Sequence, residues 1–300
     1  MTDATGHDTD RTRALIVLLT GASVIGVGPI FVRLAEVGPA AAGMWRLVFS
    51  LPLLFILARR NGGTGAPTRA TVLAGIAFAF DLGFWHYGIA YTSVAKATVL
   101  SNLTPVVVTA VAWIFLKQRP RRMFLVAVGL AVAGAWIMAA ARHGGALGKA
   151  PALGDAFSVA TAFWYAMYFL AVSSARQSQA ATRIMFWSSL TGAPLMLLAA
   201  LGLGERLLPI TSTGWAACIG LGIMHVAGQG SIAWALGRLP AATASVVVLI
   251  QPVVAALLGW WIFGELFGHL QMLGAGIALS GVVLAQWASR ARPVAPAEAV

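Results

Sequence analysis

The fold of this chain is decided by two stretches, residues 95–113, AKATVLSNLTPVVVTAVAW, and residues 242–260, ATASVVVLIQPVVAALLGW. A shift of 147 residues places Pro105 on Pro252, and no gap is needed over residues 92–138. Ten identities occur in these 47 positions, and the proline, tryptophan and glycine matches are the least expected in an apolar sequence. The chain therefore contains an internal repeat, which is typical of transporters built from two structural copies.

A second register extends the repeat toward the N-terminus. A shift of 142 residues places Trp45 on Trp187 and Pro52 on Pro194. This register is weaker evidence, because it has fewer matches, but it predicts that the two copies cover most of the chain.

Composition excludes a soluble protein. Apolar residues make up 59% of the 300 residues and charged residues 10%, against about 45–50% and about 25% in soluble domains. No soluble core of this size could bury so much apolar surface. The single Cys218 excludes an intrachain disulfide and a thiolate metal cluster. The net charge of +11 is spread between apolar runs and forms no single basic stripe, so we expect no nucleic-acid partner.

Apolar runs of membrane-spanning length recur along the whole sequence. About 20 residues in a helix cross the hydrocarbon layer of ~30 Å, and lipid leaves no solvent for unpaired backbone groups. We predict an all-α integral membrane protein with ten transmembrane helices. The predicted spans are residues 14–34, 40–58, 70–91, 94–116, 122–141, 155–175, 182–203, 214–236, 241–263 and 268–287.

The distribution of Lys and Arg between the spans predicts the orientation. With a cytoplasmic N-terminus, fourteen of these residues lie on the cytoplasmic side and five on the other, so both termini are expected in the cytoplasm. Five spans per half is an odd number, so the two five-helix repeats are inverted, with a site near the midplane. The predicted parts are a tail (1–13), the first repeat (14–148), the second repeat (149–289) and a tail (290–300).

The sequence resembles the EamA-type branch of the drug/metabolite transporter superfamily. The resemblance rests on Thr243-Ala244-Ser245 through Gln251-Pro252, on residues 260–265 and on Gly281-Val282-Val283, with a first-half copy that carries Gln118 in place of Glu265. Within the family the chain is most similar to YddG-type exporters of aromatic amino acids. The resemblance implies a bacterial inner-membrane exporter of small metabolites that needs no ATP and no bound cofactor.

Asp81 is the most informative polar residue, because an ionised carboxylate is costly in the middle of the third span. At helical spacing it shares a face with Phe78 and Trp85, which together can attract an ammonium group by charge and by cation–π interaction. Trp164 and Tyr168 of the sixth span can flank an aromatic substrate. The alternative is that these residues only pack the bundle.

A second polar line runs through the eighth span, where His225 and Gln229 lie one turn apart. They can bind a substrate carboxylate or relay a proton, but hydrogen bonding between helices explains them equally well. Asn102 of the fourth span and Gln251 of the ninth complete the predicted substrate site.

Prolines inside three spans predict bends, because proline removes an intrahelical hydrogen bond. The predicted hinges are Pro29, Pro105 and Pro252, although kinks also occur without gating. Arg46 of the second span can attract a carboxylate or pair with Glu36, and we favour the pair.

Small residues spaced four apart predict close helix packing within the bundle or in a dimer. These pairs are Gly129 with Ala133 and Gly276 with Ser280.

Catalytic motifs are missing from the sequence: it has no phosphate-binding loop, no His-Glu-x-x-His zinc motif and no acidic pair for magnesium. We expect neither an enzyme nor a metal site nor a cofactor. The predicted function is export of small amphipathic metabolites, chiefly aromatic or neutral amino acids, by alternating access, as a monomer or homodimer. The alternative is a proton-coupled multidrug exporter of lipophilic cations that uses Asp81.

Overall fold

Helices make up all the regular secondary structure in the described part of the chain. The computed structural model describes residues 3–91, 100–114, 117, 119–140, 150–263 and 268–288. The start of the fourth predicted span, Gln118, Glu265 and the C-terminal tail lie outside the described residues. The predictions that concern them are therefore untested.

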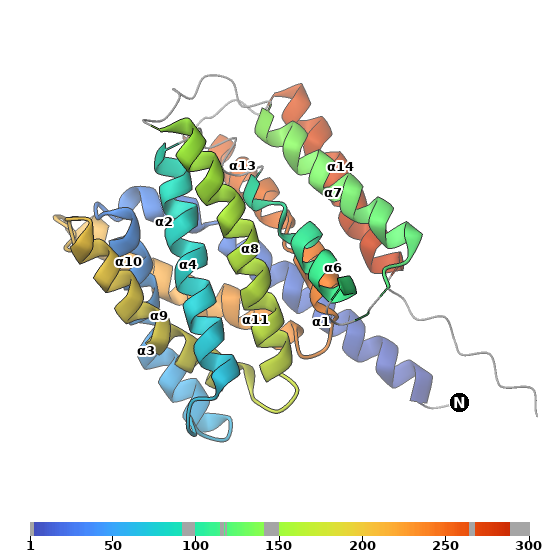
Figure 1. Cartoon of the computed structure of the whole chain (residues 1–300), viewed down its shortest axis with the longest axis horizontal. Coiled ribbons are helices and arrows are strands. Elements are labelled where there is room, and N and C mark those ends of the chain that lie inside the picture. Colours follow the sequence, from blue (N-terminus) through green and yellow to red (C-terminus); the bar gives the residue numbers. More distant parts are fainter. Residues whose placement is uncertain are drawn as a thin grey trace, which may run out of the picture.

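Among the described residues, the helices fall into a first and a second half of the chain (Figure 1). In the first half these are α1 (Asp3–Ile25), α2 (Gly28–Leu34), α3 (Pro39–Arg60), α4 (Arg69–Tyr91), α6 (Thr104–Ile114) and α7 (Arg122–Ala140). In the second half they are α8 (Pro151–Ala175), α9 (Ala181–Gly202), α10 (Ser212–Met224), the π-helical turn η1 (His225–Gln229), α11 (Gly230–Ala235), α12 (Ala241–Val247), α13 (Ile250–Phe263) and α14 (His269–Ala288).

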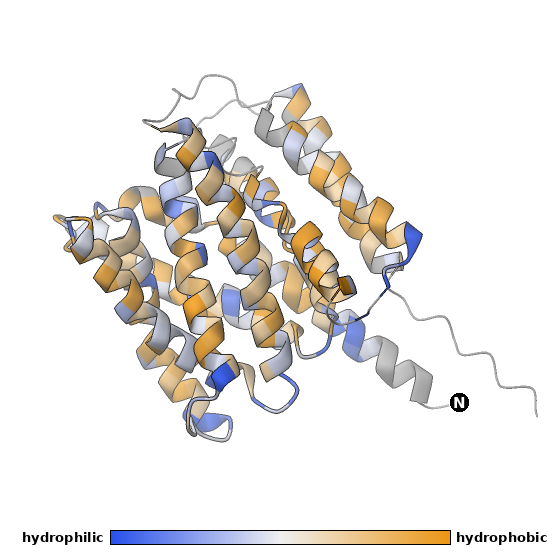
Figure 2. Cartoon of the chain, in the orientation of Figure 1, coloured by the Kyte–Doolittle hydropathy of each residue, from blue (hydrophilic) through white to orange (hydrophobic). Residues whose placement is uncertain are grey.

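Five helical segments among the described residues are long and apolar enough to cross a membrane. They are Thr9–Val32, Pro39–Arg60, Pro151–Ala175, Ala181–Gly202 and Ser212–Ala235. Shorter apolar helices occupy most of the other predicted spans. Figure 2 shows hydrophobic residues along nearly every helix, and many large apolar side chains face outward, such as Trp261 with 77% of its surface exposed. Such a surface suits lipid.

Proline marks the places where predicted spans are interrupted. The first span is divided between α1 and α2, and Pro29 lies in the first turn of α2. The ninth span is divided between α12 and α13, with Pro252 in the first turn of α13. Pro105 likewise lies in the first turn of α6. A proline fits there because its missing N–H would be unpaired anyway.

Equivalent helices of the two halves pack against each other. α3 packs on α9, and α7 packs on α14 at the edge of the bundle (Figure 1). At the second contact a Cβ atom on Gly134 would clash with the backbone of Ala278, and one on Gly281 would clash with the backbone of Ala131. These two glycines therefore permit the close approach of α7 and α14.

The small-residue pairs predicted from the sequence do not make this contact. Among the described residues nothing lies within 4 Å of a Cβ atom built on Gly129 or Gly276, and both positions are exposed. The expectation that they pack the bundle is wrong, because they occupy the outer faces of their helices. A role in a dimer stays a prediction.

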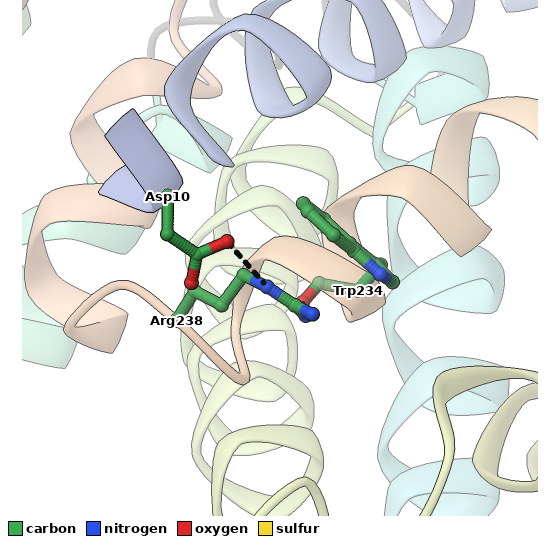
Figure 3. A network of polar contacts seen from close by, with 3 residues as sticks. All are labelled: Asp10, Trp234 and Arg238. Atoms are coloured by element: carbon green, nitrogen blue, oxygen red, sulfur yellow. Dashed lines mark hydrogen bonds and ion pairs between the residues drawn. The ribbon is translucent and has the colours of Figure 1, made fainter. Parts of the chain in front are cut away.

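A polar cluster joins the start of α1 to the segment after α11 (Figure 3). The Nε atom of Arg238 lies 3.5 Å from Oδ1 of Asp10, and the guanidinium carbon lies 3.6 Å from the ring centroid of Trp234. The N-terminal turns of α1 and the α11–α12 connection are therefore neighbours, as expected for two segments on one side of a membrane.

Candidate functional site

Polar side chains from several helices meet inside the bundle. They comprise Arg46 of α3, Asp81 of α4, Ser189 of α9 and the η1 residues His225 and Gln229, all of them buried. Arg46 is the eighth residue of α3, about 10 Å along the helix axis from its start. Polar and charged residues at such depth are costly in lipid and are a mark of function.

Arg46 connects the other members of the cluster. Its Nε atom donates a hydrogen bond to Nδ1 of His225 at 3.4 Å. Its guanidinium carbon lies 5.3 Å from the ring centroid of Phe78, in a cation–π arrangement. Arg46 also interacts electrostatically with Asp81. Two groups of opposite charge type therefore lie within the same buried region.

The predicted pair between Arg46 and Glu36 does not form. Glu36 accepts hydrogen bonds from the backbone N–H groups of Ile210 (3.1 Å) and Thr211 (2.9 Å) and from the Thr211 hydroxyl (2.9 Å). The N–H groups at the start of a helix have no partners within it and attract a carboxylate. The hydrogen bonds from Thr211, first from its backbone and then from its hydroxyl, hold the pKa of the Glu36 carboxyl below its ordinary value.

A chain of hydrogen bonds fixes the orientation of His225. The Nε2 atom of His225 lies 3.2 Å from the Ser189 hydroxyl, which lies 3.4 Å from the Ser50 hydroxyl. Ser50 donates its hydrogen to the carbonyl of Leu47 at 2.6 Å. Because Nδ1 accepts from Arg46, we assign the ring proton to Nε2, which then donates to Ser189. Both ring nitrogens are thus engaged within the protein.

Aromatic rings enclose the charged groups. Phe78 lies with its ring centroid 4.8 Å from that of Tyr168 and 5.1 Å from that of His225. Tyr165 stacks parallel to Tyr168 at 6.0 Å and lies close enough to Asp81 to interact with it electrostatically. The amide of Gln229 lies beside both tyrosine hydroxyls. These side chains make a polar centre with a largely aromatic wall.

The Gln229 amide nitrogen is fully enclosed next to the Tyr165 and Tyr168 hydroxyls, but it makes no hydrogen bond of regular geometry among the described residues. Buried donors of this kind are rare, so an unpaired one calls for an explanation such as a bound ligand or water. Gln229 ends the π-helical turn that His225 begins. Single π-helical turns inside α-helices are frequent at functional sites.

The structure separates the predicted site residues into groups. Phe78, Asp81, Tyr168, His225 and Gln229 lie together, as described above. Trp164 instead stacks on Phe80 at 4.7 Å, and Phe80 is 43% exposed, which directs this pair toward the outside of the α4–α8 contact. Trp85 lies beside the ring of His86 at 5.0 Å.

Asn102 lies in the turn that precedes α6, and Gln251 is the second residue of α13, directly after the interruption that follows α12. The side-chain amide nitrogen of each is enclosed, with no hydrogen-bond partner in the described part of the chain. The Gln251 carbonyl lies against the first-span interruption, 3.0 Å from a Cβ atom built on Gly26. These residues line the interrupted helices, and no hydrogen bond or ring contact between described residues joins them to the Arg46 cluster.

Two members of the cluster were missed by sequence reasoning, Tyr165 and Ser189. Arg46 was recognised as a residue that can attract a carboxylate but was assigned to Glu36, although a charged residue within a predicted span is a functional candidate by default. Tyr165 lies one residue from Trp164 and outside the helical stripe chosen from the sequence. Ser189 carries no distinctive signal, because serine is common in helix contacts within membranes.

No group of three or more His, Cys, Asp or Glu side chains suited to a metal ion occurs within residues 3–91, 100–114, 117, 119–140, 150–263 and 268–288. The arrangement is suited to binding a small molecule that carries charge and an apolar group.

Comparisons with known proteins agree with this architecture. The sequence profile of the EamA-like transporter family matches residues 12–140 and again residues 152–287. An uncharacterized transporter of Archaeoglobus fulgidus is 27% identical over 274 residues, covering 91% of this chain and 95% of the relative. The uncharacterized transporter YwfM of Bacillus subtilis is 26% identical over 234 residues, covering 75% of each chain.

A solved crystal structure has the same fold. It superposes with a TM-score of 0.78 at 18% identity, covering 91% of this chain and 96% of that chain. The two family matches together cover most of the sequence, and both relatives are named as transporters, not enzymes. The chain is therefore a multi-pass membrane protein that belongs to the EamA-like transporter family of the drug/metabolite transporter superfamily.

Proposed function

We propose that this protein exports small zwitterionic metabolites, chiefly aromatic or neutral amino acids, by alternating access and without ATP. The observation that carries the proposal is the buried pair of opposite charges, Arg46 and Asp81, beside Phe78, Tyr165 and Tyr168. A molecule with one charge of each sign and an apolar ring would match this composition.

The site disfavours the rival function, export of lipophilic cations coupled to protons. A cation drawn to Asp81 would also meet the positive charge of Arg46, which offsets the attraction. In a low-dielectric interior such like-charge repulsion is strong. An amino acid carries no net charge and avoids this cost.

Alternating access is supported by the packing. The counterparts in the two halves are α1 and α8, α3 and α9, and α4 and the pair α10–α11. The contact of α4 with α8 therefore corresponds to that of α11 with α1, and the contact of α3 with α10 corresponds to that of α9 with α4. Two inverted halves can open to either side by equivalent movements. We propose ten spans in two such halves, both termini in the cytoplasm and a bacterial inner membrane as the location.

Counterflow in liposomes tests the proposed function. Purified protein is reconstituted in vesicles loaded with unlabelled phenylalanine, and uptake of radiolabelled phenylalanine is followed without ATP or an ion gradient. We expect saturable uptake that depends on the internal amino acid, and none with internal tetraphenylphosphonium. Exchange of the cation alone, driven by a proton gradient, would support the rival instead. Non-saturating flux of either would indicate a channel.

A further inference from the structure

Arg46 has hydrogen-bonding capacity that the protein does not use. Its Nε atom donates to His225, but its two terminal nitrogens have no hydrogen-bond partner in the described part of the chain. These nitrogens are not among the fully enclosed polar atoms, and 6% of the residue's surface remains accessible. A guanidinium always carries its charge and offers paired N–H groups that match a carboxylate. The free end of Arg46 is therefore available to an anion.

Asp81 shows the complementary feature on the facing helix. Its carboxylate oxygens accept no hydrogen bond from any described residue, and 7% of the residue's surface remains accessible. Arg46 and Asp81 interact through space, but they do not form an ion pair within 4 Å. Two opposite charges thus stand near each other with their bonding ends unoccupied.

The hydrogen-bonded chain behind Arg46 positions its side chain. Arg46 donates to His225, His225 donates to Ser189, and the chain ends at the Leu47 carbonyl through Ser50. Phe78 covers one face of the guanidinium. The hydrogen bond at Nε and the contact of Phe78 with the guanidinium plane keep the terminal nitrogens of Arg46 in a fixed direction. This lowers the entropic cost of binding an anion.

We propose that Arg46 binds the substrate carboxylate while Asp81 binds the substrate ammonium group, so that the site selects zwitterions. The Phe78 and Tyr168 rings form the aromatic wall next to these two groups. His225 is a positioning residue for Arg46, because both its ring nitrogens are engaged. This assignment rests on the proposed function and specifies which charged group of the substrate each residue binds.

Ligands that lack one charge test the assignment. Binding to detergent-purified protein is measured by isothermal titration calorimetry with phenylalanine, with phenylalaninamide, which lacks the carboxylate, and with 3-phenylpropionate, which lacks the amine. We expect the wild-type protein to bind phenylalanine most tightly. Arg46→Gln should weaken phenylalanine binding roughly thirtyfold or more and leave phenylalaninamide binding unchanged or tighter, because this cation is then no longer repelled by the guanidinium. Arg59→Gln, at the exposed end of α3, is the matched control and should change neither.

His225→Ala separates positioning from direct binding. We expect it to weaken phenylalanine binding less than Arg46→Gln does, and Arg46→Lys to restore part of the loss because it returns the positive charge. Each variant is first checked for a single size-exclusion peak and a cooperative melt. Equal loss of phenylalanine and phenylalaninamide in a folded Arg46→Gln protein would overturn the inference. A wild type that binds none of the three ligands would instead overturn the proposed function.

Discussion

Asp81 and Arg46 illustrate at the scale of single residues why charge inside a membrane protein is informative. Each charge alone would be costly in lipid, and together they offset part of that cost. If only stability were selected for, both charged side chains would be expected to be replaced by apolar residues of similar size. Their presence is better explained by a ligand that needs both.

Asp81→Asn keeps the shape of the side chain and removes its charge. We expect phenylalanine binding to weaken at least about tenfold, since the substrate ammonium loses its partner and Arg46 is left uncompensated. Asp10→Asn, on the exposed start of α1, is the control and should leave binding unchanged. If Asp81→Asn instead abolished proton-driven exchange of a lipophilic cation while facilitated flow persisted, the rival function would be supported.

Glu36 has a pH-dependent effect on stability that can be measured. Its pKa is lowered from an ordinary value near 4.5, so its contribution is fully present above pH 4.5 and is lost as the pH falls through the lowered value. We expect Glu36→Gln to lower the melting temperature at pH 7, and the difference from the wild type to shrink below about pH 4.5. The measurement is thermal unfolding in detergent at each pH. A difference that stayed constant down to pH 3 would contradict this role.

The sequence predicted some of these residues and not others for physical reasons. Asp81 and His225 stand out because each is a polar residue in the middle of an apolar span. Arg46 was assigned to Glu36, since the two are near in sequence and opposite in charge. The sequence could not show that α10 begins beside Glu36 and takes its carboxylate, because that contact joins segments 174 residues apart.

Helices α7 and α14 each carry one glycine inside their contact and one outside it, and alanine substitutions should affect the two kinds differently. Gly134→Ala and Gly281→Ala should destabilise the protein by about 1–3 kcal/mol each, because the added methyl group meets the backbone of the partner helix. Gly129→Ala and Gly276→Ala are the matched controls and should be neutral or slightly stabilising, since the new methyl groups meet nothing and alanine favours the helix. Thermal unfolding of the four variants in one detergent measures the effect. Equal destabilisation by all four would contradict the observed packing.

The π-helical turn η1 sets the direction of the residues that follow it. Deleting Ala227 would convert the turn to regular α-helix and rotate the preceding and following parts of the span by about 100° relative to each other. We expect the variant to lose phenylalanine binding while the protein still purifies as one species. Ala227→Gly, which keeps the number of residues, is the control and should bind. Binding retained after the deletion would show that the turn is dispensable.

Sequence patterns predicted interruptions in the first and ninth spans from their prolines. The interruption between α12 and α13 falls at residues 248–249, upstream of Pro252, because the proline is accommodated in the first turn of the new helix. The π-helical turn had no comparable signal. Its extra residue changes the hydrogen-bonding pattern without a proline to mark it.

The whole molecule shows matching contacts in its two halves. Trp45 donates its indole N–H to the Leu207 carbonyl at 2.7 Å, and Trp187 donates to the Thr64 carbonyl at 2.8 Å. Each tryptophan thus holds the connection after the second long helix of the other half. The weaker sequence register, which aligned these two residues, is supported by equivalent bonds.

Repeat register and apolar length predicted the helical membrane fold, and the family comparison supports that fold. The number of spans stays a prediction, because five helices among the described residues meet the length and apolarity expected of a span. Sequence alone could not bring together Arg46, Asp81 and His225, since that requires the packing of α3 and α4 around η1.

Cysteine labelling in intact cells tests most directly whether the two halves are inverted. In a Cys218→Ser background, Asn61→Cys lies after α3 and Leu208→Cys lies in the equivalent connection after α9, and both positions are exposed. We expect a membrane-impermeant maleimide to label the Leu208→Cys protein from outside and the Asn61→Cys protein only after the cells are permeabilised. Labelling of both positions from the same side of the membrane would contradict the inverted arrangement and the alternating access built on it.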